Sequence, residues 1–353
     1  MKQDKLKVLY LFSGKRSNVY QGEIHKDYPD TPFYGLNYLS DFGFEAEYKD
    51  IYDILKSKKL IQKLPFVWQH ILLTKFIKNY NIVFGSSILY NVIFKKIFGL
   101  KTKYVLLNIS LNNTLFRNKK NKFKYRLIKY LINQLDAVVC LSHFQMDDLI
   151  SNYQIDKHKL FFVPLGVDKD FWTPVNIASS GNILAVGKDN GRDYKTLFVA
   201  ASQLPNEQFV VVCSKRNTKE LEAPANLKVV FGLPIKDLKK AYQSARMLLL
   251  ITHNDQYTDG SDCSGQTVLL DAMSSALPII VTRKQYLADY AKDKGEVLKV
   301  NFYDAGDIVA KIKMLSDQKL AGRLAKAARS KVTSCFSSRQ MAENLSQIFK
   351  QLS

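Results

Sequence analysis

The sequence has few of the features that mark secreted, metal-binding or membrane-spanning proteins. Its four cysteines lie far apart and form no Cys-x-x-Cys pair, so we expect neither a disulfide framework nor a zinc site, and a reducing compartment is favoured. Lysines interrupt the long apolar stretches, and no window reaches the roughly 18 uncharged apolar residues of a spanning helix. The N-terminus enters a strand-like segment without a signal-peptide pattern, so export is not expected. These absences predict a globular protein of the cytoplasm.

Length and hydrophobic patterning predict a two-domain α/β protein. The chain has 353 residues, of which 46% are hydrophobic, and this is enough for two domains with a core each. Apolar strand-like segments alternate with helical ones, as in parallel sheets covered on both faces. A run rich in Pro and Gly at 164–174 interrupts the alternation and is expected to act as a linker. We predict doubly wound domains at 1–168 and 169–335, and a C-terminal helix at 336–353 that packs back on the first domain.

The expected strands are short apolar runs that end near turn residues. In the first domain they are 8–12, 82–84, 105–107, 137–141 and 160–163. In the second domain they are 182–186, 209–212, 227–231, 247–251, 279–281 and 297–300. Helices are expected at 196–203, 305–316, 319–333 and 338–352.

Acidic residues are nearly missing from one region, and this makes the protein basic. Residues 51–130 carry 17 Lys or Arg but a single acid, Asp53, in a chain whose formal net charge is +20. Aromatic and aliphatic residues are interleaved with these charges. One face of an expected helix is formed by Leu127, Tyr130, Leu131 and Leu135. A basic face with aromatic residues suits an anionic membrane surface, to which each Lys or Arg contributes about 1 kcal/mol.

Two other interpretations of the basic region stay open. The apolar residues can belong to the core of the first domain, with the lysines as a solvated rim. Alternatively the anionic partner is a nucleic acid, which would give steeply salt-dependent binding. No recognisable nucleic-acid reader motif accompanies the charges. We therefore expect contact between residues 51–130 and an anionic membrane, no nucleic-acid partner, and a location peripheral to the inner face of the cell membrane.

The most informative segment for function runs from Ser264 to Thr282. It predicts a Ser/Gly-rich loop that opens a short helix, a Pro that ends the helix, and an apolar strand behind it. Unpaired backbone N–H groups at Gly265, Gln266 and Thr267 would face outward with the positive end of the helix dipole, an arrangement that binds phosphate. Asp271 lies deeper in the helix, where a carboxylate can accept hydrogen bonds from ribose hydroxyls.

The run Asp271-Ala-Met, followed by a Pro turn, resembles the nucleotide-sugar site of retaining GT-B glycosyltransferases of family 4. The family pattern is an acid, seven residues, a second acid, Ala-Met and a Gly/Ala-x-Pro turn. The resemblance implies that Asp271 holds the ribose. The first acid of the pattern falls on Cys263, which is a departure, and Asp262 beside it can serve if the loop shifts by one residue. Asp262 and Cys263 are therefore the expected contacts of the donor sugar.

Further matches follow the order of the family motifs. Val139–Ser142, the turn Leu165-Gly-Val-Asp168 with Phe171, and Gly187 with its basic cluster resemble the passage between the two domains and the loop after the second domain's first strand. The resemblance implies the GT-B fold, in which two Rossmann-like domains face each other across a cleft. It also implies a nucleotide diphosphate sugar, linked to UDP or GDP, as the donor, with neither a cofactor nor a metal ion.

The resemblance also places the donor contacts. The family's Arg position falls on Lys188 and its Lys position on Asp193, a second departure, so Arg192 and Lys195 are the expected substitutes. A guanidinium binds two phosphate oxygens at once, and an ammonium supplies charge. The expected diphosphate contacts are Gly14, Lys188, Arg192, Lys195, Ser264, Gly265, Gln266 and Thr267. The expected base contacts, at strand ends, are Ser214, Lys215 and Leu233.

No catalytic residue can be assigned from the sequence. Many relatives have a His at the position that Ser110 occupies here, and none of the five histidines lies there. If the retaining mechanism of the family holds, stabilisation of the leaving diphosphate is the main catalytic contribution. The predicted function is transfer of a sugar to a glycan or lipid-linked acceptor in cell-envelope or exopolysaccharide synthesis. The alternative is an inactive GT-B-like scaffold at the membrane, since Cys263, Asp193 and Ser110 all depart from the pattern.

Overall fold

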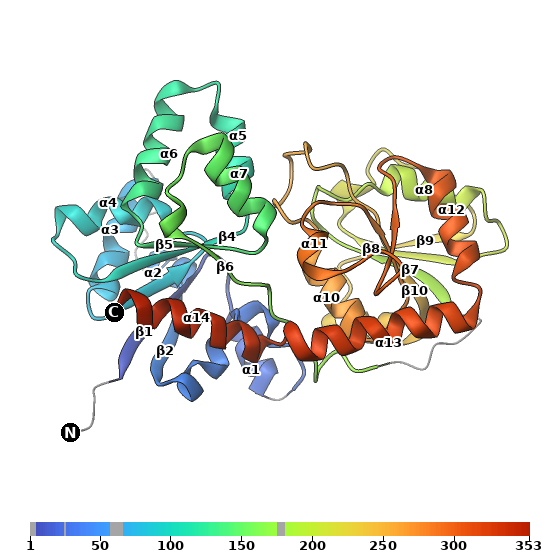
Figure 1. The fold of residues 1–353 in the computed structure, drawn as a ribbon, viewed down its shortest axis with the longest axis horizontal. Helices are drawn as coiled ribbons and strands as arrows, with labels where there is room; N and C mark the ends of the chain where they lie inside the picture. Colours follow the sequence, from blue (N-terminus) through green and yellow to red (C-terminus); the bar gives the residue numbers. More distant parts are fainter. Residues whose placement is uncertain (1–4, 25, 57–65, 175–180) are drawn as a thin grey trace. The chain divides into compact units, whose positions relative to one another are not determined.

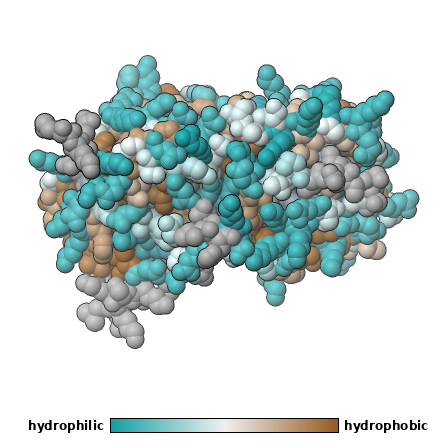
Figure 2. Space-filling view, turned by 90° about the horizontal axis from the view of Figure 1, so that it is seen from below, coloured by the Kyte–Doolittle hydropathy of each residue, from teal (hydrophilic) through white to brown (hydrophobic). Residues whose placement is uncertain are grey.

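The computed structural model describes residues 5–24, 26–56, 66–174 and 181–353, which form two compact units. The first unit extends to Pro164 and also contains the C-terminal residues Ser338–Ser353. The second unit is Leu165–Ser337, together with a short segment that ends at Pro29. On the face shown in Figure 2, hydrophilic side chains predominate and smaller apolar patches lie between them, as is usual for a globular protein.

The first unit contains a six-stranded parallel sheet in the order β2-β1-β3-β4-β5-β6. Its central strands are buried along nearly their whole length, which is why they consist of almost continuous apolar residues. From β1 the chain adds β2 on one side and then continues on the other side with β3, so the order of the strands reverses between β1 and β3. The strands are β1 (Leu6–Phe12), β2 (Phe44–Asp50), β3 (Ile82–Gly85), β4 (Lys103–Asn108), β5 (Ala137–Cys140) and β6 (Leu160–Phe162).

Helices cover both faces of the first sheet. Leu9, Leu11 and Val83 point into a core formed with helices α3 to α7, whereas Tyr10 and Phe84 point to the opposite face. The helical elements are α1 (Ser17–Ile24), η1 (Thr31–Phe33), η2 (Leu36–Phe42), α2 (Ile51–Lys56), α3 (Phe66–Ile77), η4 (Leu89–Asn91), α4 (Val92–Ile97), α5 (Leu111–Asn118), α6 (Lys122–Gln134), α7 (His143–Tyr153), η5 (Lys157–Lys159) and α14 (Ser338–Leu352).

The C-terminal helix α14 packs on η2 and so completes the second face of this unit (Figure 1). Phe349 contacts Phe84 of the sheet at 5.8 Å between ring centroids. Gly35, with a φ of +81°, permits the close approach, because a Cβ there would lie 2.8 Å from the amide nitrogen of Ala342. The Ser338 hydroxyl bonds to the buried carboxylate of Asp30. The far end of the chain is therefore an integral part of the first unit.

The second unit repeats the architecture with the order β12-β11-β10-β7-β8-β9, again all parallel. Its strands are β7 (Asn182–Val186), β8 (Phe209–Cys213), β9 (Leu227–Phe231), β10 (Ala245–Leu250), β11 (Ile279–Thr282) and β12 (Leu298–Val300). Its helical elements are α8 (Tyr194–Ser202), η6 (Lys215–Asn217), α9 (Ile235–Ser244), α10 (Gln266–Ser274), α11 (Leu287–Tyr290), α12 (Ala305–Met314) and α13 (Gln318–Cys335). α8 and α12 share one core with the sheet, and α10 packs on α13. Both units are Rossmann-like.

Every strand predicted from the sequence is present within two residues of its expected ends. The strand that was missed is β2, which reads Phe44-Glu-Ala-Glu-Tyr-Lys-Asp50 and lies at the edge of its sheet. Its exposed charged residues suit an edge strand, and they interrupt the apolar run by which a strand is predicted.

The predicted apolar face of α6 was wrong at Tyr130, which is half-exposed. The buried face consists of Ile128, Leu131 and Ile132, so it is rotated away from that ring.

Candidate functional site

The loops after β7 and β10 meet at the carboxyl end of the second sheet. The strand order reverses between these two strands, and ligands of doubly wound sheets bind at such a switch point. The amide of His253 donates to the carbonyl of Gly191 at 3.0 Å, and the amide of Asp193 donates to the carbonyl of Ile251 at 3.1 Å. These bonds join residues 187–193 to the start of the loop that leads into α10.

Helix α10 begins at this junction through Gly265, its N-cap, whose φ is +104°. The left-handed backbone favours glycine, and it exposes the positive end of the helix dipole. The prediction that the Gln266 amide is unpaired was wrong, because this amide donates to the carbonyl of Cys263 in the preceding turn. Within the described part of the chain, the amides of Gly265 and Thr267 have no acceptor. They remain available to an anion.

The guanidinium of Arg192 lies between two glycines in front of this helix. A Cβ on Gly187 would be 2.7 Å from Cζ of Arg192, and one on Gly265 would be 2.6 Å from Nη1. Only residues without a side chain leave room for the guanidinium there. Arg192 is 7% exposed, yet its Nε and Nη1 have no hydrogen-bond partner among the described residues. Burying unpaired N–H donors of a cation is costly, so this arrangement indicates a site for an anion.

Asp189 holds the two loops together. Its carboxylate accepts hydrogen bonds from the amide of Gly191 at 2.7 Å, the Ser264 hydroxyl at 2.8 Å and the amide of Ser261 at 3.1 Å. Burial alone would raise the pKa of Asp189, but these hydrogen bonds, led by that of Ser264, and the charge of Arg192 lower it overall. Asp189 therefore stays ionised. Asp189 was not among the residues predicted from the sequence, although an Asp two residues before a Gly is a turn signal.

Asp271 lies in the second turn of α10 and is 6% exposed. Its Oδ1 has no hydrogen-bond partner in the parts of the chain that the structure describes. Burial, and then the negative charge of Asp168, raise the pKa of this carboxyl well above its usual value. The hydroxyl of Tyr242 is also buried and has no partner among the residues placed in the structure, and its own pKa is raised by burial and then by Asp271. A ligand that carries hydroxyl groups would complete the hydrogen bonding of this carboxyl.

The remaining predicted diphosphate contacts have different surroundings. Asp193, where the family has a Lys, is a buried N-cap of α8 and accepts hydrogen bonds from the amide and hydroxyl of Thr196. Lys188 and Lys195 both extend into solvent. The structure thus brings Arg192, Ser264 and Gly265 together and leaves the two lysines outside that cluster.

The predicted donor-sugar contacts, Asp262 and Cys263, are buried in the turn that leads into α10. Gln266, the first residue of the helix, is buried as well, whereas the Thr267 side chain is exposed. Tyr286 supports this turn, because its hydroxyl donates to the carbonyl of Ser264 at 3.1 Å. The turn is therefore held from both sides of the helix entrance.

The predicted base contacts follow β8 and β9, which are neighbours in the sheet with Cys213 opposite Phe231. Ser214 begins a short 3-10 turn, and the side-chain amide of Asn217 in that turn donates to the carbonyl of Asp189 at 3.1 Å. Lys215 is exposed and Leu233 is half-buried. Phe231, whose ring is 46% exposed at the end of β9, was not among the predicted contacts. This edge offers both apolar and polar surface.

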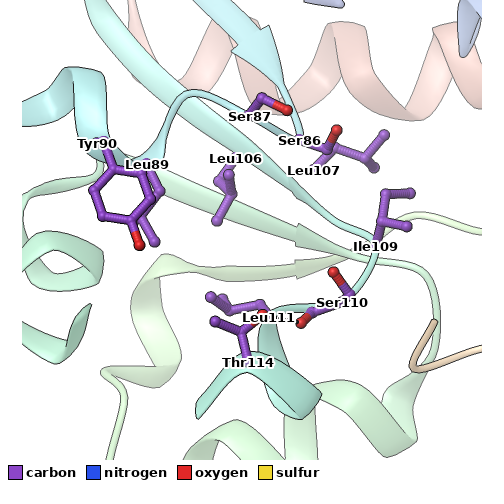
Figure 3. A pocket seen from close by; sticks show the side chains of 10 residues that line it. All are labelled: Ser86, Ser87, Leu89, Tyr90, Leu106, Leu107, Ile109, Ser110, Leu111 and Thr114. Atoms are coloured by element: carbon purple, nitrogen blue, oxygen red, sulfur yellow. Dashed lines mark hydrogen bonds between the residues drawn. The ribbon is translucent and has the colours of Figure 1, made fainter. Parts of the chain in front are cut away.

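The first unit has a cavity of about 300 Å³ at the ends of β3 and β4 (Figure 3). Ser110, at the position of the family's His, is one of its lining residues and is the N-cap residue of α5, without a side-chain capping bond. None of the lining side chains is charged; five carry hydroxyl groups and the other five are aliphatic. They are Ser86, Ser87, Leu89, Tyr90, Leu106, Leu107, Ile109, Ser110, Leu111 and Thr114. The cavity suits an uncharged ligand with both apolar and hydroxyl-bearing parts.

Gly14, the predicted diphosphate contact of the first unit, follows β1. A Cβ there would meet only Nη1 of Arg16 at 3.6 Å, which is an ordinary contact, so the position does not demand glycine. The Arg16 amide next to it donates to the carboxylate of Asp50 at 2.9 Å. Among the residues that the structure covers, no cluster of three His, Cys, Asp or Glu side chains forms a metal site.

Comparison with known proteins identifies the family. The model of glycosyltransferase family 4 matches residues 50–171, and the model of glycosyl transferases group 1 matches residues 192–331. The chain is a family 4-like glycosyltransferase with the GT-B fold. The second match contains Arg192, Gly265 and Asp271, so the cluster around α10 belongs to the part of this glycosyltransferase that the family shares. No curated protein matches the sequence.

Solved structures show the same fold. A glycosyltransferase from Rickettsia africae is 16% identical with a TM-score of 0.69, and the match covers 99% of each chain. HepE from Anabaena, in complex with UDP and glucose, is 12% identical with a TM-score of 0.70, covering 98% of this chain and 99% of HepE. A sucrose-phosphate synthase from Thermosynechococcus elongatus is 15% identical with a TM-score of 0.72, covering 99% of each chain. At these identities the likeness concerns the fold.

Proposed function

We propose that this glycosyltransferase moves a sugar from a nucleotide diphosphate donor to a glycan or lipid-linked acceptor, with retention of the anomeric configuration and without a metal ion. The observation that carries the proposal is the buried guanidinium of Arg192, whose unpaired N–H groups meet the N-terminus of α10. The setting proposed for the reaction is synthesis of cell-envelope or extracellular polysaccharide.

The donor diphosphate would lie in front of Gly265. There the Arg192 Nε and Nη1 donate to phosphate oxygens, and the amides of Gly265 and Thr267 add neutral donors along the helix dipole. Asp189 keeps both loops in place through Ser264 and Gly191. HepE binds UDP and UDP-glucose, which supports a UDP-linked donor here, with a GDP-linked donor as the alternative.

The remaining parts of the donor follow from this placement. The ribose hydroxyls would bond to Asp271, whose unpaired Oδ1 lies deeper along the same helix. The base would lie over the ends of β8 and β9, near Ser214 and Leu233, where the exposed ring of Phe231 offers a stacking surface. Lys188 and Lys215 would act from solvent as added charge, and the buried turn at Asp262 and Cys263 would face the donor sugar.

Leaving-group stabilisation is the chemical step that these residues can perform. As the bond between the anomeric carbon and the phosphate oxygen breaks, negative charge grows on the diphosphate, and fixed cations and amides stabilise that charge most. The acceptor oxygen forms the new bond on the face that the diphosphate leaves, and its proton passes to an oxygen of the departing diphosphate. Arg192 and the α10 amides supply this stabilisation from the protein alone, so no metal ion is required.

The acceptor would enter the cavity of the first unit drawn in Figure 3. The hydroxyl groups of Ser86, Ser110 and Thr114 suit hydroxyl groups of a sugar, and the leucines suit its apolar face. Because no charged side chain lines the cavity, the part of the acceptor that enters it is uncharged.

The membrane contact would involve helices α4 to α6. Large apolar side chains on them are exposed, with Phe123 reaching 80% exposure, among lysines and arginines that are mostly exposed as well. The other exposed apolar residues there are Ile97, Phe98, Phe116 and Tyr130. Residues 57–65 of the basic region lie outside the described chain. No helix in the described ranges is long and apolar enough to cross a bilayer. We propose peripheral binding to the cytoplasmic face of the membrane.

Turnover with the purified protein tests the proposal. In the presence of EDTA, we expect one member of a panel of UDP- and GDP-sugars to release its nucleoside diphosphate. In proton NMR spectra, the sugar that leaves the donor should first appear as the same anomer as in the donor. Inverted product would refute retention, and a requirement for added metal would refute the metal-independent mechanism. No turnover with any donor, together with binding to anionic vesicles, would favour the scaffold function instead.

A further inference from the structure

A second pocket in the first unit is formed by α1, η2 and β2. Its volume is about 330 Å³, which falls in the range of small-ligand sites. It shares no lining residue with the cavity of Figure 3. The lining residues are Tyr20, Leu36, Asn37, Ser40, Ala46, Glu47 and Tyr48.

Two tyrosine rings form the apolar wall of this pocket. The rings of Tyr20 and Tyr48 lie 5.4 Å apart between centroids. Phe33, which is buried, contacts both of them at 5.7 and 5.9 Å. Phe12 contacts Tyr48 at 6.0 Å. The wall is therefore backed by packed aromatic side chains, and Tyr20 still has 37% of its surface exposed.

Polar side chains complete the lining. The side-chain amide nitrogen of Asn37 is buried and has no hydrogen-bond partner in the described part of the structure. Glu47 is exposed and is the one charged lining side chain. A carboxylate accepts hydrogen bonds from hydroxyl groups and repels anions. Aromatic faces, an amide and a carboxylate match a sugar ring, which has an apolar C–H face and a rim of hydroxyl groups.

The pocket lies close to the carboxyl edge of the first sheet. Tyr48 pairs with Tyr10, and Asp50 pairs with Phe12 at the end of β1. Tyr48 is thus two residues before the strand ends, beside the loop in which the Arg16 amide bonds to Asp50. Tyr48 is therefore the lining residue of β2 nearest to this end of the strand, whereas Ala46 and Glu47 lie nearer its middle.

We propose that this pocket is a second saccharide subsite, which holds an uncharged sugar ring of the acceptor glycan away from the reacting hydroxyl group. The assignment rests on the proposed glycosyl transfer to a glycan. Binding at such a remote subsite helps to orient the reacting end of the acceptor.

Saturation-transfer NMR on the full-length protein tests the subsite without a donor. The probes are cellobiose, maltose and lactose as neutral disaccharides, and glucuronic acid as an anionic sugar. We expect transfer to at least one neutral disaccharide and weaker transfer to glucuronic acid. Tyr20→Ala should weaken binding about tenfold through loss of one ring contact, whereas Tyr20→Phe should retain it. Met314→Ala, which removes an exposed apolar side chain of the second unit, should bind as the unmodified protein does.

Three results would overturn the subsite: no transfer to any of the neutral disaccharides, equal binding by Tyr20→Ala and Met314→Ala, or displacement of the disaccharide by UDP. A thermal shift with UDP, measured on the same samples, reports on the donor site and on folding of the variants. Disaccharide binding without a UDP shift would refute the proposed donor and leave the subsite standing. A UDP shift without disaccharide binding would support the proposed donor and refute the subsite.

Discussion

Replacing Arg192 by methionine removes the buried cation while keeping a long apolar side chain. The Nε and Nη1 of Arg192 are buried and find no partner in the described ranges of the chain, and an unsatisfied buried donor costs about 1–3 kcal/mol. The free energy of unfolding of the variant should therefore be unchanged or higher, even though Asp189 loses a nearby positive charge.

Binding of UDP should change in the opposite direction. Two hydrogen bonds from a cation to phosphate contribute about 1.5–3 kcal/mol each, so their loss amounts to about 3–6 kcal/mol, or roughly 10² to 10⁴-fold in the dissociation constant. Arg192→Lys should recover only part of the affinity, because one ammonium cannot replace a planar pair of donors. Lys195→Met is the matched control, since it removes an exposed positive charge from the following helix and should cost less than about 1 kcal/mol.

Isothermal titration gives the dissociation constant, and urea unfolding without ligand gives the stability. A fall in UDP affinity with preserved stability is the expected pair of results. If Arg192→Met bound UDP within about twofold of the unmodified protein, or if Lys195→Met weakened UDP equally, Arg192 would not be the diphosphate contact.

Three further changes probe the same account. Gly265→Ala places a Cβ 2.6 Å from Nη1 of Arg192 at a φ of +104°, so urea unfolding should show a loss of about 1–3 kcal/mol together with a lost UDP shift; full stability would contradict the geometry. The pKa of Asp271 is raised by burial and by Asp168, so the folded protein binds a proton at this carboxyl more tightly than the unfolded chain does. The free energy of unfolding therefore falls as the pH rises from about 3.9 through the folded pKa. Asp271→Asn should therefore gain stability relative to the unmodified protein as pH increases, and it should lose the part of UDP binding that the ribose provides. A stability gain that becomes smaller as the pH rises would contradict the raised pKa. Phe123→Ser should reduce binding to anionic vesicles in a flotation assay more than Phe231→Ser, which alters a less exposed ring of the second unit; equal effects would exclude α6 from the membrane contact.

Strand and helix positions could be predicted because buried parallel strands are nearly continuous apolar runs. β10 and β11, for example, contain no charged residue except Arg246. β2 could not be predicted in this way, because this edge strand alternates charged and apolar residues. The glycine entrance of α10 was also predictable, since its left-handed φ requires a residue type that is visible in the sequence.

The details of the site depended on tertiary contacts. The sequence placed Lys188 at the family's Arg position and offered Arg192 and Lys195 as substitutes for its Lys, but of these three only Arg192 is enclosed by the two glycines. Asp189 was missed because its partners, Ser261 and Ser264, lie more than 70 residues away along the chain. The departure at Asp193 has a local reason, since this residue caps α8. Which of these side chains lie together is set by the fold and not by their spacing along the sequence.

The most direct test compares UDP, UMP and uridine by isothermal titration with the full-length protein. If the pocket of Arg192 and the α10 amides holds the second phosphate group, UDP should bind at least about 100-fold more tightly than UMP, which corresponds to about 2.7 kcal/mol. GDP and GMP provide the same comparison for the other base. Equal affinity for the monophosphate and the diphosphate, with either base, would contradict the central claim.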